Sequence, residues 1–387
     1  MTTRFSKFVF AFSALVLSAL SAAAQPVNAP AVVSLIGDDP NAFIRFLNND
    51  GGNDGREIRV ELRDVYAGVS CVYVAPFQRH SARIPGWNYP ILEKPGPGEY
   101  RYIRFAWKRD GGDGIMVQLH SNGLWNHRYY AGERSQQTST WGPMMQVDPK
   151  APREWTVVTR DLFKDWGNMH LTGFAFTPME NGVGGYFGPI YLSRTIEDLD
   201  RASADAFGKT ALKDALTQKE LDALWDDLAK ADLKAADAAT RKLTAGRKES
   251  VAFLAAKAKA KDAGINMKEV ASWIADLDSE DFGVREDAYR SLSKLGDRAI
   301  SPLQQARMNP RSGEQKNRIE SLLKDRGAIN GGLTGDRVRL VRAARVLEWS
   351  GTAEALSALE VFEKMPDAAA LPEIKHARER LAKTVKR

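Results

Sequence analysis

The stretch Trp225–Leu254 reads WDDLAKADLKAADAATRKLTAGRKESVAFL, and the stretch Ile274–Leu303 reads IADLDSEDFGVREDAYRSLSKLGDRAISPL. When the first is moved forward by 49 residues, its apolar positions and two aspartates coincide with those of the second. The matched pairs are Leu228 with Leu277, Leu233 with Phe282, Ala239 with Ala288, Leu243 with Leu292, Val251 with Ile300, Leu254 with Leu303, Asp227 with Asp276 and Asp232 with Asp281. A fixed period of this size is typical of stacked helical units that cannot bury their apolar faces alone. The repeat therefore predicts a helical array, a class that usually binds other macromolecules.

Residues 201–387 as a whole are expected to be helical. Apolar residues at helical spacing predict helices at 217–230, 234–244, 247–262, 267–277, 283–295, 298–308, 312–325, 335–350, 352–364 and 371–385, after a helical connector at 200–213. The unit Trp273–Ala306 resembles the HEAT repeat, in which a helix ends near a glycine, here Gly296, and the next helix starts soon after. A divergent third unit is indicated by Ala343, Leu347 and Gly351, which match Ala288, Leu292 and Gly296 at an offset of 55. The resemblance implies an all-α HEAT-like solenoid.

The N-terminus has the pattern of a secretory signal peptide over residues 1–24. Arg4 and Lys7 are followed by an apolar run of 13 residues, Phe8–Leu20, and then by three alanines that end at Ala24. That run is too short to span a bilayer, and no later stretch approaches about 20 apolar residues. We therefore expect cleavage near Ala24, a periplasmic or secreted protein, and no membrane span.

Charge is spread evenly along the mature chain. Residues 25–200 contain 18 basic and 20 acidic residues, and residues 201–387 contain 35 and 29. Because both signs alternate along the predicted helices, the mild basic excess indicates solvated faces, and nucleic acid is not an expected partner. Cys71 is the only cysteine, so an internal disulfide is excluded and the core must hold by packing.

Residues 25–200 have the pattern of an antiparallel β-sandwich. Six of the nine tryptophans lie here, and short alternating segments are separated by Gly and Pro. The clearest predicted hairpin joins 99–108 to 115–120 through Asp110–Gly114. Other strands are expected at 69–75, 127–131, 155–159, 171–177 and 186–192, and a short capped helical turn at 161–167. The predicted core between the sheets consists of Ile103, Phe105, Trp107, Ile115, Val117 and Leu119.

Four segments in this region also carry a family resemblance. They are Arg83–Trp87, Pro97–Lys108, Glu154–Leu162 and Tyr186–Leu192. In this order they resemble a galactose-binding-like jelly-roll module of large exported bacterial proteins, similar in architecture to carbohydrate-binding modules. The resemblance covers about 65–195 and implies a jelly roll without fixing the ligand, because such folds host many functions. The sequence departs from the family at Gly188, where an aspartate is common.

Catalytic motifs are not found in the sequence. The five histidines lack the spacing of a zinc site, and there is no nucleophile elbow or phosphate loop. Asp161 and Asp165 lie one helical turn apart, a spacing that suits capping better than glycoside cleavage. No cofactor is expected. One loop, with Asp50, Asn53 and Asp54, has the oxygen donors of a structural calcium site or is a plain flexible turn.

The strongest ligand candidate is a face of the predicted hairpin. Aromatic rings stack on sugar rings, and Arg, Gln and His can hydrogen-bond their hydroxyl groups. The candidate residues are Tyr102, Arg104, Gln118, His120, Trp125, Arg128, Tyr130 and Trp141, with Tyr100 beside them. Either the face is open to a glycan, or a second sheet or the helices cover it.

The sequence thus favours an exported, non-catalytic binding or scaffold protein of the cell envelope. A jelly-roll module would bind a glycan or protein, and the helical array would hold a protein partner. Two alternatives remain: a carbohydrate-binding protein, or an envelope polysaccharide hydrolase or its accessory module.

Overall fold

The structure is a computed structural model. It describes residues 29–385 except 49–56, 76, 135, 137, 180–183, 211, 213, 263–265, 326–332, 334 and 366–370. The predicted signal peptide at 1–24 and the predicted calcium residues Asp50, Asn53 and Asp54 lie outside the described residues. Both therefore stay predictions.

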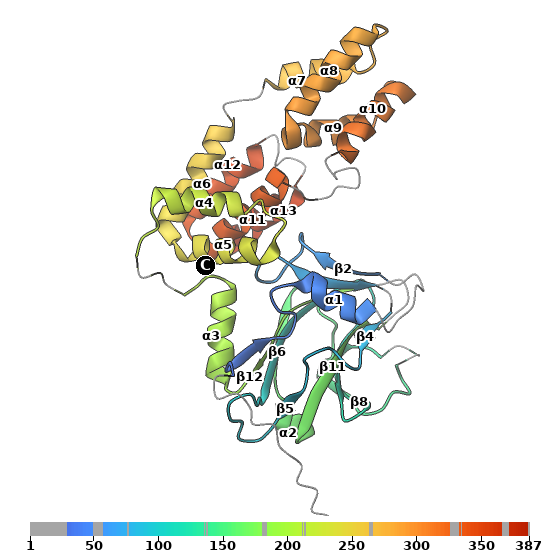
Figure 1. The fold of residues 1–387 in the computed structure, drawn as a ribbon, viewed down its shortest axis with the longest axis vertical. Helices are drawn as coiled ribbons and strands as arrows, with labels where there is room; N and C mark the ends of the chain where they lie inside the picture. Colours follow the sequence, from blue (N-terminus) through green and yellow to red (C-terminus); the bar gives the residue numbers. More distant parts are fainter. Residues whose placement is uncertain are drawn as a thin grey trace, which may run out of the picture.

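The described residues of the N-terminal half form two six-stranded sheets (Figure 1). Sheet A has the order β10 (Thr156–Asp161), β6 (Tyr102–Asp110), β12 (Gly184–Ser193), β3 (Cys71–Ala75) and β2 (Glu57–Glu61), with β1 (Val32–Ser34) on β12. Sheet B has the order β4 (Arg79–Ser81), β11 (Met169–Pro178), β7 (Gly114–Ser121), β8 (Leu124–Gly132) and β9 (Met145–Asp148), with β5 (Tyr89–Ile91) on β11. The pairings are antiparallel except for the parallel β8–β9 pair.

One apolar core lies between the two sheets, because the apolar faces of the alternating strands meet there. All six residues predicted to form it are in this cluster and at most 1% exposed, which confirms that part of the interpretation. Helix α1 (Pro40–Asn48) adds Phe43 and Leu47 to the core, and the short α2 (Leu162–Trp166) adds Leu162. Asp161 caps α2 by accepting from Lys164 N at 3.0 Å, as the sequence indicated.

The predicted hairpin between 99–108 and 115–120 is wrong. Strand β6 pairs with β10 and β12 in sheet A, whereas β7 pairs with β11 and β8 in sheet B. The turn at 111–113 therefore carries the chain from one sheet to the other. Both arrangements point Phe105 and Val117 into one core, so alternation alone cannot distinguish them. The tight hairpin is instead β7–β8, whose turn residues Asn122 and Gly123 have φ of 52° and 80°.

The C-terminal half is helical. Its elements are α4 (Gln218–Asp227), α5 (Leu233–Ala245), α6 (Arg247–Asp262), α7 (Met267–Asp276), α8 (Phe282–Lys294), the 3₁₀ turn Gly296–Ala299, α9 (Ile300–Arg307), α10 (Gly313–Lys324), α11 (Gly335–Ser350), α12 (Ala353–Lys364) and α13 (Pro372–Val385). Moving α4 and α5 forward by 49 residues gives the bounds of α7 and α8, so the repeat in the sequence is a repeat of helices. None of the described helices is long and apolar enough to cross a membrane.

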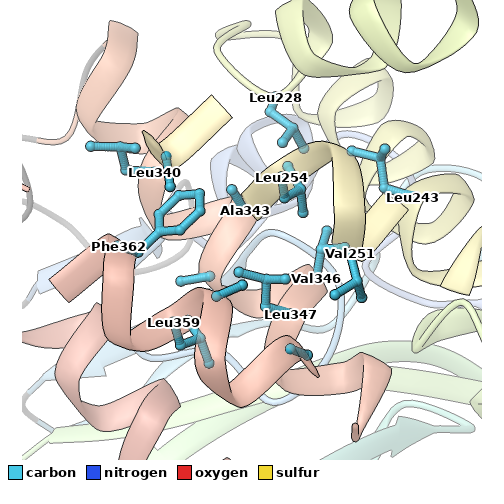
Figure 2. Close-up of a cluster of buried hydrophobic side chains, with 14 of the residues drawn as sticks. Leu228, Leu243, Val251, Leu254, Leu340, Ala343, Val346, Leu347, Leu359 and Phe362 are labelled. Atoms are coloured by element: carbon cyan, nitrogen blue, oxygen red, sulfur yellow. The ribbon is translucent and has the colours of Figure 1, made fainter. Parts of the chain in front are cut away.

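The described helices bury two separate cores. The first repeat (α4–α6) shares one core with α11–α13, in which Leu228 and Leu254 lie among Leu340, Ala343 and Phe362 (Figure 2). The second repeat (α7–α9) packs with α10 around Leu277, Leu292 and Leu303, and forms the separate lobe at the top of Figure 1. The first unit thus packs on the third directly, which departs from a simple stack in sequence order.

A loop of the sandwich joins the two halves. Residues 62–69 follow β2, and Arg345 of α11 donates to their backbone, to the carbonyl oxygens of Leu62, Arg63 (3.1 Å) and Val69 (3.5 Å). Helix α3 (Ile196–Ala206) packs on the outer face of sheet A, and the ring of Phe207 after it lies 5.4 Å from that of Trp349 on α11.

Candidate functional site

The predicted candidate residues divide between the two outer faces of the sandwich. Because β6 and β7 belong to different sheets, Tyr102 and Arg104 lie on the outside of sheet A, while Gln118 and His120 lie on the outside of sheet B. Trp125, Arg128 and Tyr130 on β8 and Trp141 in the following loop join the second group. The single face that the sequence predicted does not exist.

On sheet A, the Arg104 side chain is hydrogen-bonded to helix α3 and to strand β10. Its Nε donates to Thr159 Oγ1 at 2.8 Å, Nη1 to Ser203 Oγ at 2.9 Å, and Nη2 to Asp200 Oδ1 at 2.8 Å. Each guanidinium nitrogen therefore has a partner within the fold, and the side chain is 16% exposed. Tyr100 is also buried, and its hydroxyl donates to the Pro30 carbonyl at 3.2 Å.

On sheet B, the residues form what we call the Gln118 face: His80, Gln118, His120, Trp125, Arg128, Tyr130, Trp141 and Thr177. Cross-strand register aligns His80, Ala175, Gln118 and Arg128 in one row over β4, β11, β7 and β8. Neighbouring residues of such a row lie about 5 Å apart, because that is the spacing between strands. A row across these strands is therefore as long as one or two sugar rings.

A buried polar pair lies at the centre of this face. Gln118 Oε1 accepts from Arg128 Nε at 2.7 Å, and Gln118 Nε2 donates to Thr177 Oγ1 at 2.9 Å. Gln118 is 1% exposed and Arg128 is 7% exposed. Burial lowers the pKa of Arg128, yet a guanidinium still keeps its charge at neutral pH. Its Nη1 reaches the Pro143 carbonyl only at 3.5 Å, which leaves donor capacity at the outer end of the side chain.

Two half-buried tryptophans also belong to this face. The Trp125 ring follows the Asn122–Gly123 turn and contacts the rings of His80 (5.7 Å) and His120 (5.0 Å) edge to face. The Trp141 ring lies 5.4 Å from the Arg128 guanidinium and 5.9 Å from the Phe77 ring. His120 Nδ1 lies 2.8 Å from Thr172 Oγ1, and burial lowers the pKa of its ring, which favours the neutral form. The face thus exposes parts of Trp125, Tyr130 and Trp141, and beneath them lie the polar groups of Gln118, His120 and Arg128, which are at most 7% exposed.

Two members of this face, His80 and Thr177, were missed by the sequence interpretation. The pairing of β4 with β11 brings in His80, and the pairing of β11 with β7 brings in Thr177. Phe77, just before β4, lies beside the face and contacts Trp141. The dipeptide Asn122–Gly123 is the strongest short signal for a two-residue hairpin, and it would have placed Trp125 beside His120. No such signal marks the contact between strands far apart in the sequence.

Other polar residues weighed in the sequence have structural partners. Arg101 donates to Asp161 from Nε at 2.9 Å, and Asp165 binds Arg160 and accepts from the Tyr129 hydroxyl at 2.8 Å. Gly188 lies at a register shift of β12 with φ of 129°, a conformation that residues with side chains rarely adopt, which accounts for glycine at that position. Among the described residues, no three His, Cys, Asp or Glu side chains are grouped as they would be around a metal ion.

Comparisons with known proteins do not assign this chain to a family. No family model matches the sequence, and no curated protein matches it. Among solved structures, the chain is similar to one described as "Crystal Structure of Family 30 Carbohydrate Binding Module", at 13% identity, over 36% of this chain and 83% of that one, with a TM-score of 0.23. A score this low carries no conclusion about this chain.

Proposed function

We propose that this chain is an exported, non-catalytic binding protein whose Gln118 face takes a glycan. The observation that supports it is that two half-buried tryptophans, Trp125 and Trp141, lie on the same face as the hydrogen-bonded Gln118–Arg128 pair. Indole faces stack on the apolar faces of sugar rings, and Arg128, Tyr130 and His120 supply hydrogen bonds to hydroxyl groups. In this proposal the sandwich is a jelly-roll module of the carbohydrate-binding kind.

The non-catalytic part of the proposal rests on how the acidic residues are used. A glycosidase needs two carboxyl groups flanking the scissile bond. In sheet A and α2 the two acids considered for this role, Asp161 and Asp165, serve Arg101 and Arg160 instead. The alternative is an envelope polysaccharide hydrolase or its accessory module. Release of reducing ends from any polysaccharide that the purified chain binds would favour that alternative.

The test is binding to a panel of soluble polysaccharides, measured by affinity electrophoresis and calorimetry. We expect at least one neutral glycan to bind, and Trp125→Ala and Trp141→Ala each to weaken its binding at least 10-fold. Leu124→Ser is the matched control, since Leu124 is 56% exposed on the same hairpin but offers no ring. The glycan site would be refuted if no glycan bound, or if Trp125→Ala and Trp141→Ala bound the glycan as tightly as Leu124→Ser and the wild type.

For the helical half we propose a protein partner, with the second repeat as the surface that meets it. HEAT-like units commonly present such surfaces. Phe282 on α8 is 63% exposed and Met308 after α9 is 82% exposed, whereas the matched first-repeat residue Leu233 is partly covered. Photo-crosslinking from position 282 in envelope extract should capture one protein, and Phe282→Ser should abolish its co-purification. A blank at that position would refute this surface.

Export to the periplasm or beyond is the remaining part of the proposal. It is supported by the basic, apolar and small-residue order of residues 1–24. N-terminal sequencing of the protein recovered from the envelope fraction should begin at or near Gln25. A chain that retains Met1 in the cytoplasmic fraction would contradict export.

A further inference from the structure

A cavity of about 240 Å³ lies on the other outer face of the sandwich, over sheet A. Its floor is formed by β6, β10 and β12, one wall by the end of α3, and the other wall by the loop 62–69 that joins the two halves. The cavity is separate from the Gln118 face, which belongs to sheet B.

The walls of this cavity are mainly apolar. Tyr66, Tyr191 and Phe207 supply three aromatic rings, and Val157 and Ala206 supply aliphatic surface. The rings of Tyr66 and Phe207 meet edge to face at 5.1 Å, which fixes one corner. Val157 is 39% exposed, so it lies at the mouth. Such a lining favours a ligand that is itself a flat apolar ring.

The polar groups of the cavity select against charge. Arg104 reaches the lining, but its three guanidinium nitrogens already donate to Thr159, Ser203 and Asp200. The Asp200 carboxylate already pairs with this guanidinium, so a second carboxylate gains little attraction there, while its own desolvation opposes binding. Ser203 Oγ accepts from Arg104 and keeps its own O–H, which can donate to one ligand oxygen or ring.

The volume sets the size of the ligand. An apolar cavity of about 150 Å³ admits benzene, and sites for drug-sized ligands begin at about 300 Å³. A cavity between these limits suits one or two fused rings with a single polar atom. We propose that this cavity binds a small neutral aromatic molecule of the phenol or indole class.

A ligand in this cavity would also stabilise the contact between the β-sandwich and the helical half. The Phe207 ring contacts Trp349 of α11 at 5.4 Å, and Arg345 of α11 holds the carbonyl groups of the loop that carries Tyr66. A ligand seated in the corner that the Tyr66 and Phe207 rings form contacts both connections at once. It therefore stabilises the docked arrangement by mass action, in proportion to its own affinity for that arrangement.

The experiment titrates the full-length mature protein with p-cresol and with indole, followed by ligand-observed NMR and calorimetry. Benzoate, of similar size but anionic, is the comparison ligand. We expect p-cresol or indole to bind at least 10-fold more tightly than benzoate. Ala206→Leu, which fills the cavity from α3, should weaken binding at least 10-fold, and Ala204→Leu on the same helix should not, since Ala204 is not part of the lining.

Two results would overturn the proposal: no binding of either neutral compound up to its solubility, or binding that Ala206→Leu leaves unchanged. If Ala206→Leu loses its native circular dichroism spectrum, Val157→Trp narrows the same cavity from the exposed strand β10 and is read in the same way. Neither variant touches the Gln118 face, so glycan binding is expected to persist in both.

Discussion

The first two helices of each repeat have matching bounds, 49 residues apart, but the backbone carbonyl groups in the turn between these helices receive their hydrogen bonds from different places. In the first repeat, the turn between α4 and α5 receives a guanidinium from outside: Arg342 of α11 donates to the carbonyl oxygens of Leu228 and Lys230, both at 2.8 Å. In the second repeat, Arg285 of α8 itself donates to the matched carbonyl of Ser279 at 2.6 Å. The turn of the first repeat therefore receives its guanidinium from a distant helix, whereas the turn of the second receives one from the helix that directly follows it.

One position accounts for much of this difference. The residue matched to Arg285 is Ala236, which is fully buried and too short to reach the turn. Its small side chain leaves space for α11 to pack on α5, and α11 then brings Arg342. Repeats with similar apolar patterns can thus occupy different places in a fold, because residues outside the shared pattern, such as Ala236 and Arg285, differ between them.

The largest expected effect compares matched core leucines. Leu254 and Leu303 are both fully buried, so truncation of either to alanine should cost about 3 kcal/mol. Leu254 lies in the core shared with α11–α13, as Figure 2 shows, whereas Leu303 lies in the core of the separate lobe. Hydrogen exchange should therefore accelerate throughout α4–α6 and α11–α13 in Leu254→Ala, but only in α7–α10 in Leu303→Ala. Equal acceleration of α11 in both variants would show that the lobes unfold together.

A second comparison removes the two guanidinium groups. Arg342 is 1% exposed, and burial, followed by the nearby Arg345, lowers its pKa to about 10, so it stays charged at neutral pH. Arg342→Ala leaves the buried Leu228 carbonyl and the partly buried Lys230 carbonyl without this donor and should cost about 3 kcal/mol. Arg285 is more exposed, and Arg285→Ala should cost about 1 kcal/mol, since water can replace it. Urea unfolding of both variants measures this difference, and equal midpoints would remove the distinction between the repeats.

Much of the helical half follows from the sequence, because apolar periodicity and caps act locally. Asp232 and Asp281 each accept from the first backbone N–H groups of the helix that follows, so both helix starts were predictable. That the first unit shares a core with the third depends on contacts between residues more than 100 positions apart, such as Leu228 and Arg342. No periodic pattern records such contacts.

The sandwich and its candidate site were predictable to a smaller extent. Alternation gave the inward faces of β6 and β7, but not the sheet to which each belongs. Arg104 and Gln118 were therefore placed together when they lie on opposite outer faces. Local signals fixed which residues point inward, and only the pairing of distant strands fixes which outward residues meet.

A smaller effect compares the ends of α5 and α8. Gly296 follows α8 with φ of 61°, and Gly351 follows α11 with φ of 71°. Helices often end with a glycine in this left-handed conformation. The position matched to Gly296 in the first repeat is Arg247, an exposed residue with φ of 44°. A left-handed conformation costs a residue with a side chain about 1 kcal/mol. Arg247→Gly should raise the midpoint of thermal unfolding and Gly296→Ala should lower it. A lower midpoint for Arg247→Gly would mean that the Arg247 side chain stabilises α6.

The smallest expected effect concerns the start of the first repeat, where Thr217 and Glu220 form a capping box on α4. The bond from the Thr217 backbone N–H, followed by the Lys242 ammonium, lowers the pKa of Glu220 to about 2 from its usual 4.5. A carboxyl group whose pKa is lower in the folded chain stabilises it above about pH 4.5 and loses that contribution as pH falls toward 2. Wild type and Glu220→Gln should therefore differ in stability at neutral pH and converge as the pH approaches 2. Because the group is exposed, the difference is small, and NMR titration of its side-chain carboxyl carbon is the more direct measurement. In Lys242→Met that titration should move part of the way back toward 4.5, whereas an unchanged curve would mean that the backbone N–H alone holds the carboxylate.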